Sequence, residues 1–225
     1  VAIIGSGMIG CELAEDLIEA GHQVTMISRE ALPLSNLLPE TAALRLKESL
    51  QALGVTFLAS CEISRVDTGQ SLTFTDDTHL IFDQLVAATG LKTDNRLARQ
   101  AGLAFDRGIA VDPVTLQTNE ADIFALGDCI SLNGDPCRFI EPIKYQAQAI
   151  AHGILGLNQS DYRHQAPVVR LKTRSLPIVI HGIPKEEGEW QTVSDNDQEL
   201  VMEQRVGDDI VALLQVNLTN SSRAA

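Results

Sequence analysis

Three glycines near the start of the chain are the first residues whose spacing could do chemistry. Gly5, Gly7 and Gly10 follow four apolar residues typical of a buried strand, and a helical pattern begins after them. In such a turn the first glycine permits the tight bend, the second lets a pyrophosphate approach the backbone, and the third lets the helix pack on the strand. The free amides of the first helical turn then face the phosphates. This spacing predicts a dinucleotide site, with a purely structural glycine turn as the alternative.

A second buried strand, Val24–Ile27, follows this helix and completes a β-α-β order. A carboxylate at the end of that strand commonly binds the ribose hydroxyls of the nucleotide. Here the strand runs into Ser28, Arg29 and Glu30, so no acid occupies the usual position. Glu30 could reach the ribose from slightly further on, whereas Arg29 could meet the 2′-phosphate of NADPH or face solvent. The pattern favours NADH over NADPH.

The first domain is expected to span residues 1–92. A helical pattern covers Pro39–Leu53, and strands are expected at Val55–Leu58 and Gln84–Gly90. Short alternating runs between these two strands indicate a small antiparallel meander. The runs lie near Ile63–Val66, Leu72–Phe74 and His79–Phe82.

A second domain is expected over residues 93–160. Its strands are expected at Gly108–Asp112 and Ile123–Asp128, and the latter ends in Gly-Asp. Asp128 could therefore direct its carboxylate at a ligand beyond the carboxyl end of the sheet, with a turn or helix-capping acid as the alternative. Pro142 then opens a helix that is expected to run to Leu155, because proline is favoured in the first helical turn.

The remaining residues, 161–225, are expected to form a small C-terminal domain. Arg163–Pro184 has the pattern of strands and turns, and Glu186–Asp209 is strongly acidic. The polar end of the chain shows no helical pattern. This region is therefore expected to be an appendage to the two nucleotide-type domains.

Composition excludes several classes of protein. The 225 residues are 44% hydrophobic and 21% charged, which is ordinary for a soluble globular chain. The formal net charge of −13 argues against general nucleic-acid binding, because nothing would drive counterion release from phosphates. No apolar run approaches the ~18 residues of a membrane span, and no signal peptide is visible. The four cysteines have no metal-ligand spacing, so we expect reduced thiols, no metal site and a cytoplasmic location.

Three segments together resemble the two-dinucleotide-binding flavoprotein reductases, the pyridine nucleotide-disulfide oxidoreductase family. Gly5–Ala14 resembles the NADH-site fingerprint of that family, Val86–Gly90 its ATG strand, and Thr118–Asp128 its second FAD motif. In the family the FAD fingerprint lies much further upstream of the Gly-Asp motif than the distance here. The glycine turn is therefore similar to the NAD(P)H site, and we expect the first FAD half-domain to lie before Val1.

The resemblance implies an α/β fold with FAD and NAD(P)H as cofactors. Residues 1–92 would be a Rossmann-like NAD(P)H domain inserted in a split FAD domain of the same class. Residues 93–160 would be the second part of that FAD domain, and residues 161–225 a small C-terminal α+β domain.

Within the family, Pro167–Val179 resembles a segment of rubredoxin–NAD(+) reductases, although Arg174 stands where those enzymes tend to have proline. The resemblance implies a flavoprotein that passes electrons from NADH through FAD to rubredoxin. The enzyme alternative is a related reductase of ferredoxin, flavorubredoxin or oxygen. The non-enzyme alternative is a nucleotide-binding fragment that cannot hold FAD.

Hydride transfer from nicotinamide to flavin needs positioning more than acid–base groups, so no catalytic side chain is expected. The resemblance places Asp128 at the FAD ribityl hydroxyls and the helix from Pro142 at the flavin pyrimidine. Lys172 would reach the same edge, and Glu12 would face the flavin–nicotinamide junction. The alternatives are a solvated strand lysine and an exposed helix acid. The expected cofactor-binding residues are Gly5, Gly7, Met8, Ile9, Gly10, Glu12, Glu30, Gly90, Gly127, Asp128, Ile140, Pro142, Ile143 and Lys172.

A basic belt interrupts this otherwise acidic chain. No Asp or Glu occurs from Tyr162 to Lys185, whereas Arg163, Arg170, Lys172, Arg174 and Lys185 do. Such a belt could attract a small acidic electron carrier such as rubredoxin, with a solvated sheet face as the alternative. The expected docking residues are Arg163, Arg170 and Arg174.

Overall fold

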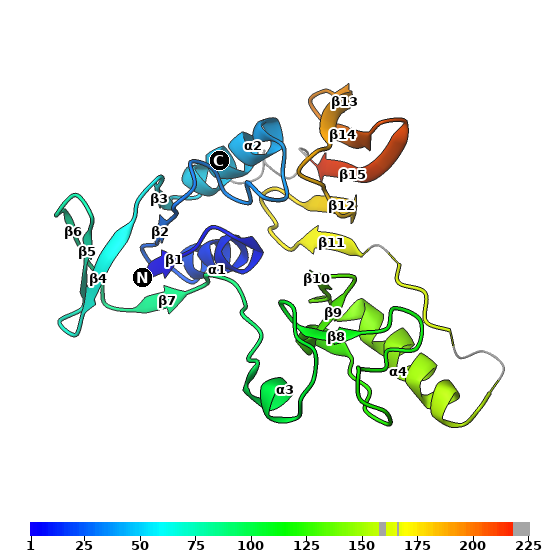
Figure 1. Ribbon diagram of the computed structural model, residues 1–225. Helices are drawn as coiled ribbons and strands as arrows, with labels where there is room; N and C mark the ends of the chain where they lie inside the picture. Colours follow the sequence, from blue (N-terminus) through cyan, green and yellow to red (C-terminus); the bar gives the residue numbers. More distant parts are fainter. Residues whose placement is uncertain (158–160, 166, 218–225) are drawn as a thin grey trace. The chain divides into compact units, whose positions relative to one another are not determined.

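The computed structural model describes residues 1–157, 161–165 and 167–217 (Figure 1). Contacts divide the chain into two compact units. The first unit joins Val1–Gly90 to the chain from Val168 onward, and the second is Leu91–Pro167. The expected division into three domains, at residues 92 and 160, stays a prediction.

A four-stranded parallel sheet forms the centre of the first unit, in the order β3-β2-β1-β7. Ile3 and Met26 on its two central strands are fully buried, as apolar runs covered on both faces should be. Helix α1 connects β1 to β2, and helix α2 connects β2 to β3, as the sequence pattern predicts. The elements are β1 (Ala2–Ile4), α1 (Met8–Glu19), β2 (Thr25–Ile27), α2 (Glu40–Ala52), β3 (Thr56–Leu58) and β7 (Leu85–Ala87).

The expected meander lies between β3 and β7. Its strands β4 (Ile63–Asp67), β5 (Ser71–Phe74) and β6 (His79–Ile81) pair antiparallel in chain order. Leu72 and Phe74 on the central strand pack against the parallel sheet and share a buried cluster with it. Burial of this apolar face holds the meander on the nucleotide-type sheet.

A five-stranded antiparallel sheet completes the first unit, in the order β11-β12-β15-β14-β13. The acidic stretch Glu186–Asp209 forms two of these strands and the start of a third. Residues 168–217 contain no helix. The strands are β11 (Val168–Leu171), β12 (Ile178–Gly182), β13 (Glu189–Asp195), β14 (Glu199–Val206) and β15 (Asp209–Asn217).

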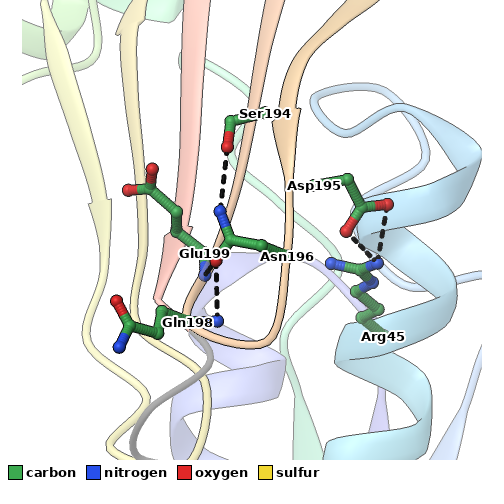
Figure 2. Close-up of polar contacts among 6 residues, drawn as sticks. All are labelled: Arg45, Ser194, Asp195, Asn196, Gln198 and Glu199. Carbon is green, nitrogen blue, oxygen red and sulfur yellow. Dashed lines mark hydrogen bonds and ion pairs between the residues drawn. The ribbon is translucent and has the colours of Figure 1, made fainter.

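The β13–β14 turn attaches this sheet to helix α2, as Figure 2 shows. Asn196 Oδ1 accepts hydrogen bonds from the backbone N–H groups of Gln198 and Glu199, at 2.9 and 3.1 Å. Next to this turn, Arg45 Nη2 donates to both carboxylate oxygens of Asp195, at 2.7 and 3.0 Å. An ion pair thus joins residues that are 150 positions apart in the sequence.

We expect the Asp195→Asn change to lower the free energy of unfolding by less than about 1 kcal/mol, because both partners are partly exposed and water screens the pair. Asp197→Asn, in the same turn, is the matched control. Urea denaturation at low salt measures the difference, and 1 M NaCl should narrow it. A difference between the two variants that is insensitive to salt would contradict this ionic origin.

The second unit holds a three-stranded sheet in the order β10-β9-β8, with β8 and β9 parallel. Its core gathers Leu116, Ile130 and Ala149 with the buried side chains of Cys137 and Tyr162. Helix α4 begins close to the expected Pro142, which lies in its first turn. The elements are α3 (Arg96–Gln100), β8 (Ile109–Val111), β9 (Ile130–Leu132), β10 (Asp135–Pro136) and α4 (Glu141–Ile154).

The strand expected at Ile123–Asp128 is wrong. Only Phe124 in this segment pairs, in an isolated bridge to Gln117, and a short 3-10 turn occupies Gly127–Cys129. The N–H of Thr118 donates to the Ile123 carbonyl, which folds the preceding residues into a tight loop. Gly127 has a φ of +76°, which ends the extended run before the Gly-Asp pair is complete.

Candidate functional site

The turn between β1 and α1 gives each of its glycines a different environment. Gly5 has a φ of +110°, and a Cβ on it would lie 2.3 Å from the Ala88 carbonyl oxygen. A Cβ on Gly10 would lie 2.2 Å from the Gly5 carbonyl oxygen, so helix and strand backbones are in direct contact there. A Cβ on Gly7 would meet nothing within 4 Å. The packed positions and the open position match the steric roles that a dinucleotide turn requires.

The first turn of α1 is free to bind an anion. Gly7 is its N-cap, and no side chain caps the helix. The amides that follow therefore point at the open space beside Gly7 without a side-chain acceptor. Met8 is half-buried and Ile9 is 60% exposed, so the helix start is accessible. The geometry fits the pyrophosphate of a dinucleotide.

A buried pair of serines connects this turn to the end of β2. Ser6 Oγ lies 2.8 Å from Ser28 Oγ, and Ser28 Oγ also accepts the N–H of Glu30 at 3.0 Å. Ser28 occupies the position where an acid is usual, but its side chain is buried beneath the turn. Glu30 and Arg29 are both exposed. The sequence pattern contained no signal for the serine pair.

Gly90 lies at the same edge of the parallel sheet, three residues beyond β7. It has a φ of +94° and is exposed, and the Ala88 N–H donates to the Ile4 carbonyl just before it. The structure therefore brings Gly90 to the carboxyl ends of β1 and β7, where α/β sheets bind their ligands.

Helix α1 also holds the turn between β11 and β12. Glu12 Oε1 accepts the Lys172 backbone N–H at 2.8 Å. Glu15 is only 3% exposed, and its two oxygens accept the N–H groups of Arg174 and Ser175 at 2.9 and 2.8 Å. We call Glu12 and Glu15 the carboxylate clamp. The expected site residues Glu12 and Lys172 are thus neighbours, and sequence reasoning missed Glu15.

The side chain of Arg174 is already paired. Its Nη2 lies 3.0 Å from Asp16 Oδ1 and also contacts the carboxylate of Glu19, both on α1. Arg170, on β11, is exposed. The basic belt is therefore less positive around Arg174 than its composition indicates.

In the second unit, Asp128 is exposed on the 3-10 turn, and its carbonyl accepts a hydrogen bond from Thr93 Oγ1 at 3.4 Å. Gly127 is buried beside the start of α4, where a Cβ on it would lie 3.6 Å from Ile143 Cδ1. Ile140 is the N-cap of α4, is 86% exposed and provides no side-chain cap. The exposed carboxylate of Asp128 can accept hydrogen bonds from hydroxyls, and the uncapped first turn of α4 can donate N–H groups. This combination fits the ribityl chain and the pyrimidine of a flavin.

A pocket of about 610 Å³ in this unit was not foreseen, and none of the expected site residues lines it. Arg138 lines this pocket and links two other lining residues. Its Nη1 donates to the Leu91 carbonyl at 2.6 Å and its Nη2 to Thr93 Oγ1 at 3.3 Å. The lining residues are Leu91, Lys92, Thr93, Asp94, Asn95, Phe105, Arg107, Pro136 and Arg138.

Burial keeps the thiols of Cys11 and Cys137 protonated. Burial, and secondarily the charge of Glu12, raises the pKa of Cys11 from 9.0 to about 12. Burial likewise raises the pKa of Cys137. All four cysteines are free. No cluster of three or more His, Cys, Asp or Glu side chains that could hold a metal occurs in the part of the chain that the structure describes.

Cys11 should make folding stability fall at alkaline pH. Its thiol ionises near 9.0 in the unfolded chain but near 12 in the folded one, so stability is intact below pH 9 and declines between pH 9 and 12. In this range the free energy of unfolding should fall by about 1.4 kcal/mol per pH unit. Cys11→Ala should remove this part of the slope in urea titrations, whereas Cys61→Ala should leave it. Equal slopes in the wild type and Cys11→Ala would contradict the assignment.

Comparison with known proteins identifies the class. Residues 1–153 match the family described as "Pyridine nucleotide-disulphide oxidoreductase", and the chain belongs to this family. The resemblance of the three sequence motifs is thereby confirmed, and the family implies FAD and NAD(P)H as cofactors. No helix among the described residues is long and apolar enough to span a bilayer.

The relatives include the "Nitric oxide reductase FlRd-NAD(+) reductase" of Escherichia coli O157:H7 (strain EC4115 / EHEC), which is 38% identical over 195 residues, 85% of this chain and 51% of that protein. The protein of the same name from Shigella dysenteriae serotype 1 (strain Sd197) is also 38% identical with the same coverage. The chain spans about half the length of these curated relatives.

Solved structures confirm the α/β fold. The covalent putidaredoxin reductase–putidaredoxin complex matches with a TM-score of 0.85 and 22% identity, over 97% of this chain and 55% of that one. Reduced Bacillus anthracis CoADR-RHD matches with a TM-score of 0.86 and 21% identity, over 97% of this chain and 44% of that one. At these identities the match defines the fold alone.

Proposed function

We propose that this chain carries the NADH site and part of the FAD site of a reductase that passes electrons from NADH through FAD to rubredoxin. A flavorubredoxin is the second candidate acceptor, because the curated relatives are named FlRd-NAD(+) reductases. The observation that carries the proposal is the β1–α1 turn, in which Gly5 and Gly10 are packed against backbone and Gly7 is open. Family membership supports the flavin.

The residues of this chain would bind and orient NADH and FAD. The first-turn amides beside Gly7 would hold the pyrophosphate, and Glu30 would accept the ribose hydroxyls. Asp128 would accept the ribityl hydroxyls, and the first turn of α4 would offer N–H groups to the pyrimidine. Lys172 stays a proposed flavin contact, by resemblance. When bound, FAD would supply the conversion of a hydride into single electrons.

Absorbance and stopped-flow measurements on the purified protein test this function. We expect a yellow protein that is bleached by NADH without oxygen, more readily than by NADPH, and that is reoxidised by added rubredoxin or flavorubredoxin. Ferredoxin and oxygen are the comparison acceptors. A colourless protein that binds NADH would instead support the fragment alternative, and reoxidation by ferredoxin or oxygen alone would overturn the proposed acceptor.

Arg163, Arg170 and Arg174 stay proposed docking residues for an acidic carrier, and all three are exposed. Arg170→Glu should slow association with an acidic carrier and flatten its dependence on salt, because a steering charge is reversed. Arg65→Glu, in the meander and 68% exposed, is the control for net charge. Equal salt dependence in Arg170→Glu and the wild type would refute docking at this residue.

A further inference from the structure

Gln146 is a polar residue in the core of the second unit. Its side chain lies on α4 and is 0% exposed. Its Oε1 accepts the Gly127 backbone N–H at 2.8 Å. Its Nε2 lies 3.3 Å from Cys137 Sγ and 3.4 Å from the Tyr162 hydroxyl. Because a buried amide is costly unless both of its ends are paired, this arrangement is specific to one orientation.

The orientation of the amide follows from its neighbours. The Gly127 N–H can only donate, so the oxygen of Gln146 must face it. On the other side, the Tyr162 hydroxyl lies 2.8 Å from His164 Nδ1 and can accept from Gln146 while it donates to the imidazole. Tyr162 is itself anchored, since its N–H donates to the Val114 carbonyl at 2.8 Å. The chain after α4 therefore fixes the rotamer of Gln146.

Gly127 is the residue that needs such support. It is buried in the left-handed region, at a φ of +76°, and begins the 3-10 turn that presents Asp128 to solvent. Without Gln146 its N–H would lose its partner on α4. Asp128 follows Gly127 directly, so a change in the glycine backbone, which can adopt many conformations, would redirect the Asp128 side chain.

We propose that Gln146 is the positioning residue of the flavin-side carboxylate. By holding the Gly127 N–H it sets the direction of Asp128, and Tyr162 sets the rotamer of Gln146. The inference rests on the proposed function, since it assigns Asp128 to FAD. It adds a contact that couples α4 to the Gly-Asp turn through a side chain outside the sequence motifs.

The test compares flavin and nicotinamide binding in the same variants. Gln146→Met removes both ends of the amide at similar length, and Tyr162→Phe removes one hydroxyl partner. Gln148→Met, on an exposed position of the same helix, is the matched control. Binding of added FAD to protein stripped of flavin is followed by flavin fluorescence, and NADH binding by nicotinamide fluorescence. Hydrogen exchange of the Gly127 amide is followed by NMR without cofactor.

Gln146→Met should raise the Kd for FAD about tenfold, while the Kd for NADH is unchanged and the Gly127 amide exchanges faster. Tyr162→Phe should act in the same direction with a smaller effect. Because Gln146 and the NADH turn lie in different units, a loss of folding in the second unit would also spare NADH, so FAD affinity is compared only in variants whose urea denaturation matches the wild type. Equal weakening of both cofactors overturns the proposal, as does wild-type FAD affinity in Gln146→Met.

If Gln146→Met does not fold, the proposal is tested with Tyr162→Phe. Unchanged FAD affinity together with unchanged exchange of the Gly127 amide in Tyr162→Phe overturns the proposal. A wild-type protein that binds NADH but no added FAD contradicts the proposed function instead, and the assignment of Asp128 to FAD falls with it. The wild-type protein therefore tests the function, and the variants test the positioning.

Discussion

Gly10→Ala is expected to lower the free energy of unfolding of the first unit by about 3 kcal/mol and to abolish NADH binding. The added methyl would lie 2.2 Å from the Gly5 carbonyl oxygen, and its nearest neighbours are backbone atoms that cannot rotate away. Helix α1 would have to move off β1, which displaces the amides at its first turn. Urea denaturation and nicotinamide fluorescence measure the two effects.

Gly7→Ala is the matched comparison, because the same methyl group there meets nothing within 4 Å and the φ of −75° suits alanine. Stability should change by less than about 1 kcal/mol. The affinity for NADH should nevertheless fall at least about tenfold, since the methyl fills the space where a pyrophosphate approaches. Wild-type affinity in Gly7→Ala would place the phosphates elsewhere, and wild-type stability in Gly10→Ala would refute the close packing.

Glu15→Ala should destabilise the first unit by about 3 kcal/mol, because a buried and a partly buried backbone N–H group lose their acceptor together. These are the amides of Arg174 and Ser175 at the turn that follows Lys172. The carboxylate is 3% exposed, so water can reach the freed amides only if the turn moves. Chemical denaturation gives the magnitude, and hydrogen exchange of the two amides gives the location.

Glu19→Ala on the same helix is the control. Glu19 contacts the guanidinium of Arg174, but both side chains are substantially exposed. Its loss should cost less than about 0.5 kcal/mol. Similar losses in Glu15→Ala and Glu19→Ala would show that the carboxylate clamp contributes no more than a surface ion pair.

Local patterns explain the parts of the fold that could be predicted. The parallel strands, the two long helices of the first unit and the meander all follow from short-range periodicity with glycine or proline at the boundaries. The glycine turn could be recognised because its three glycines lie within six consecutive residues. Its steric environment then supported the reading, with Gly5 and Gly10 packed and Gly7 open.

Long-range contacts explain most of what could not be predicted. Strand β14 buries Leu200 and Met202 on one face, but its acidic neighbours hid this alternation within a charged stretch. Glu15 and Gln146 are the residues missed at the site, because their partners lie 159 or 160 and 19 positions away. A polar side chain within a helix can be recognised as buried only when the distant N–H group that it accepts is known.

The first unit is discontinuous, and this has a consequence for synthesis on the ribosome. Val1–Gly90 emerges before the second unit, yet the amide that Glu12 accepts follows 160 residues later. The entropy of closing so long a loop is recovered only when β11 to β15 have formed. Until then Glu15 and the α1 face around it remain hydrated, and the nascent nucleotide domain is open to chaperones and proteases. Strands β11 to β15, which are translated after the second unit, therefore determine when α1 becomes stable.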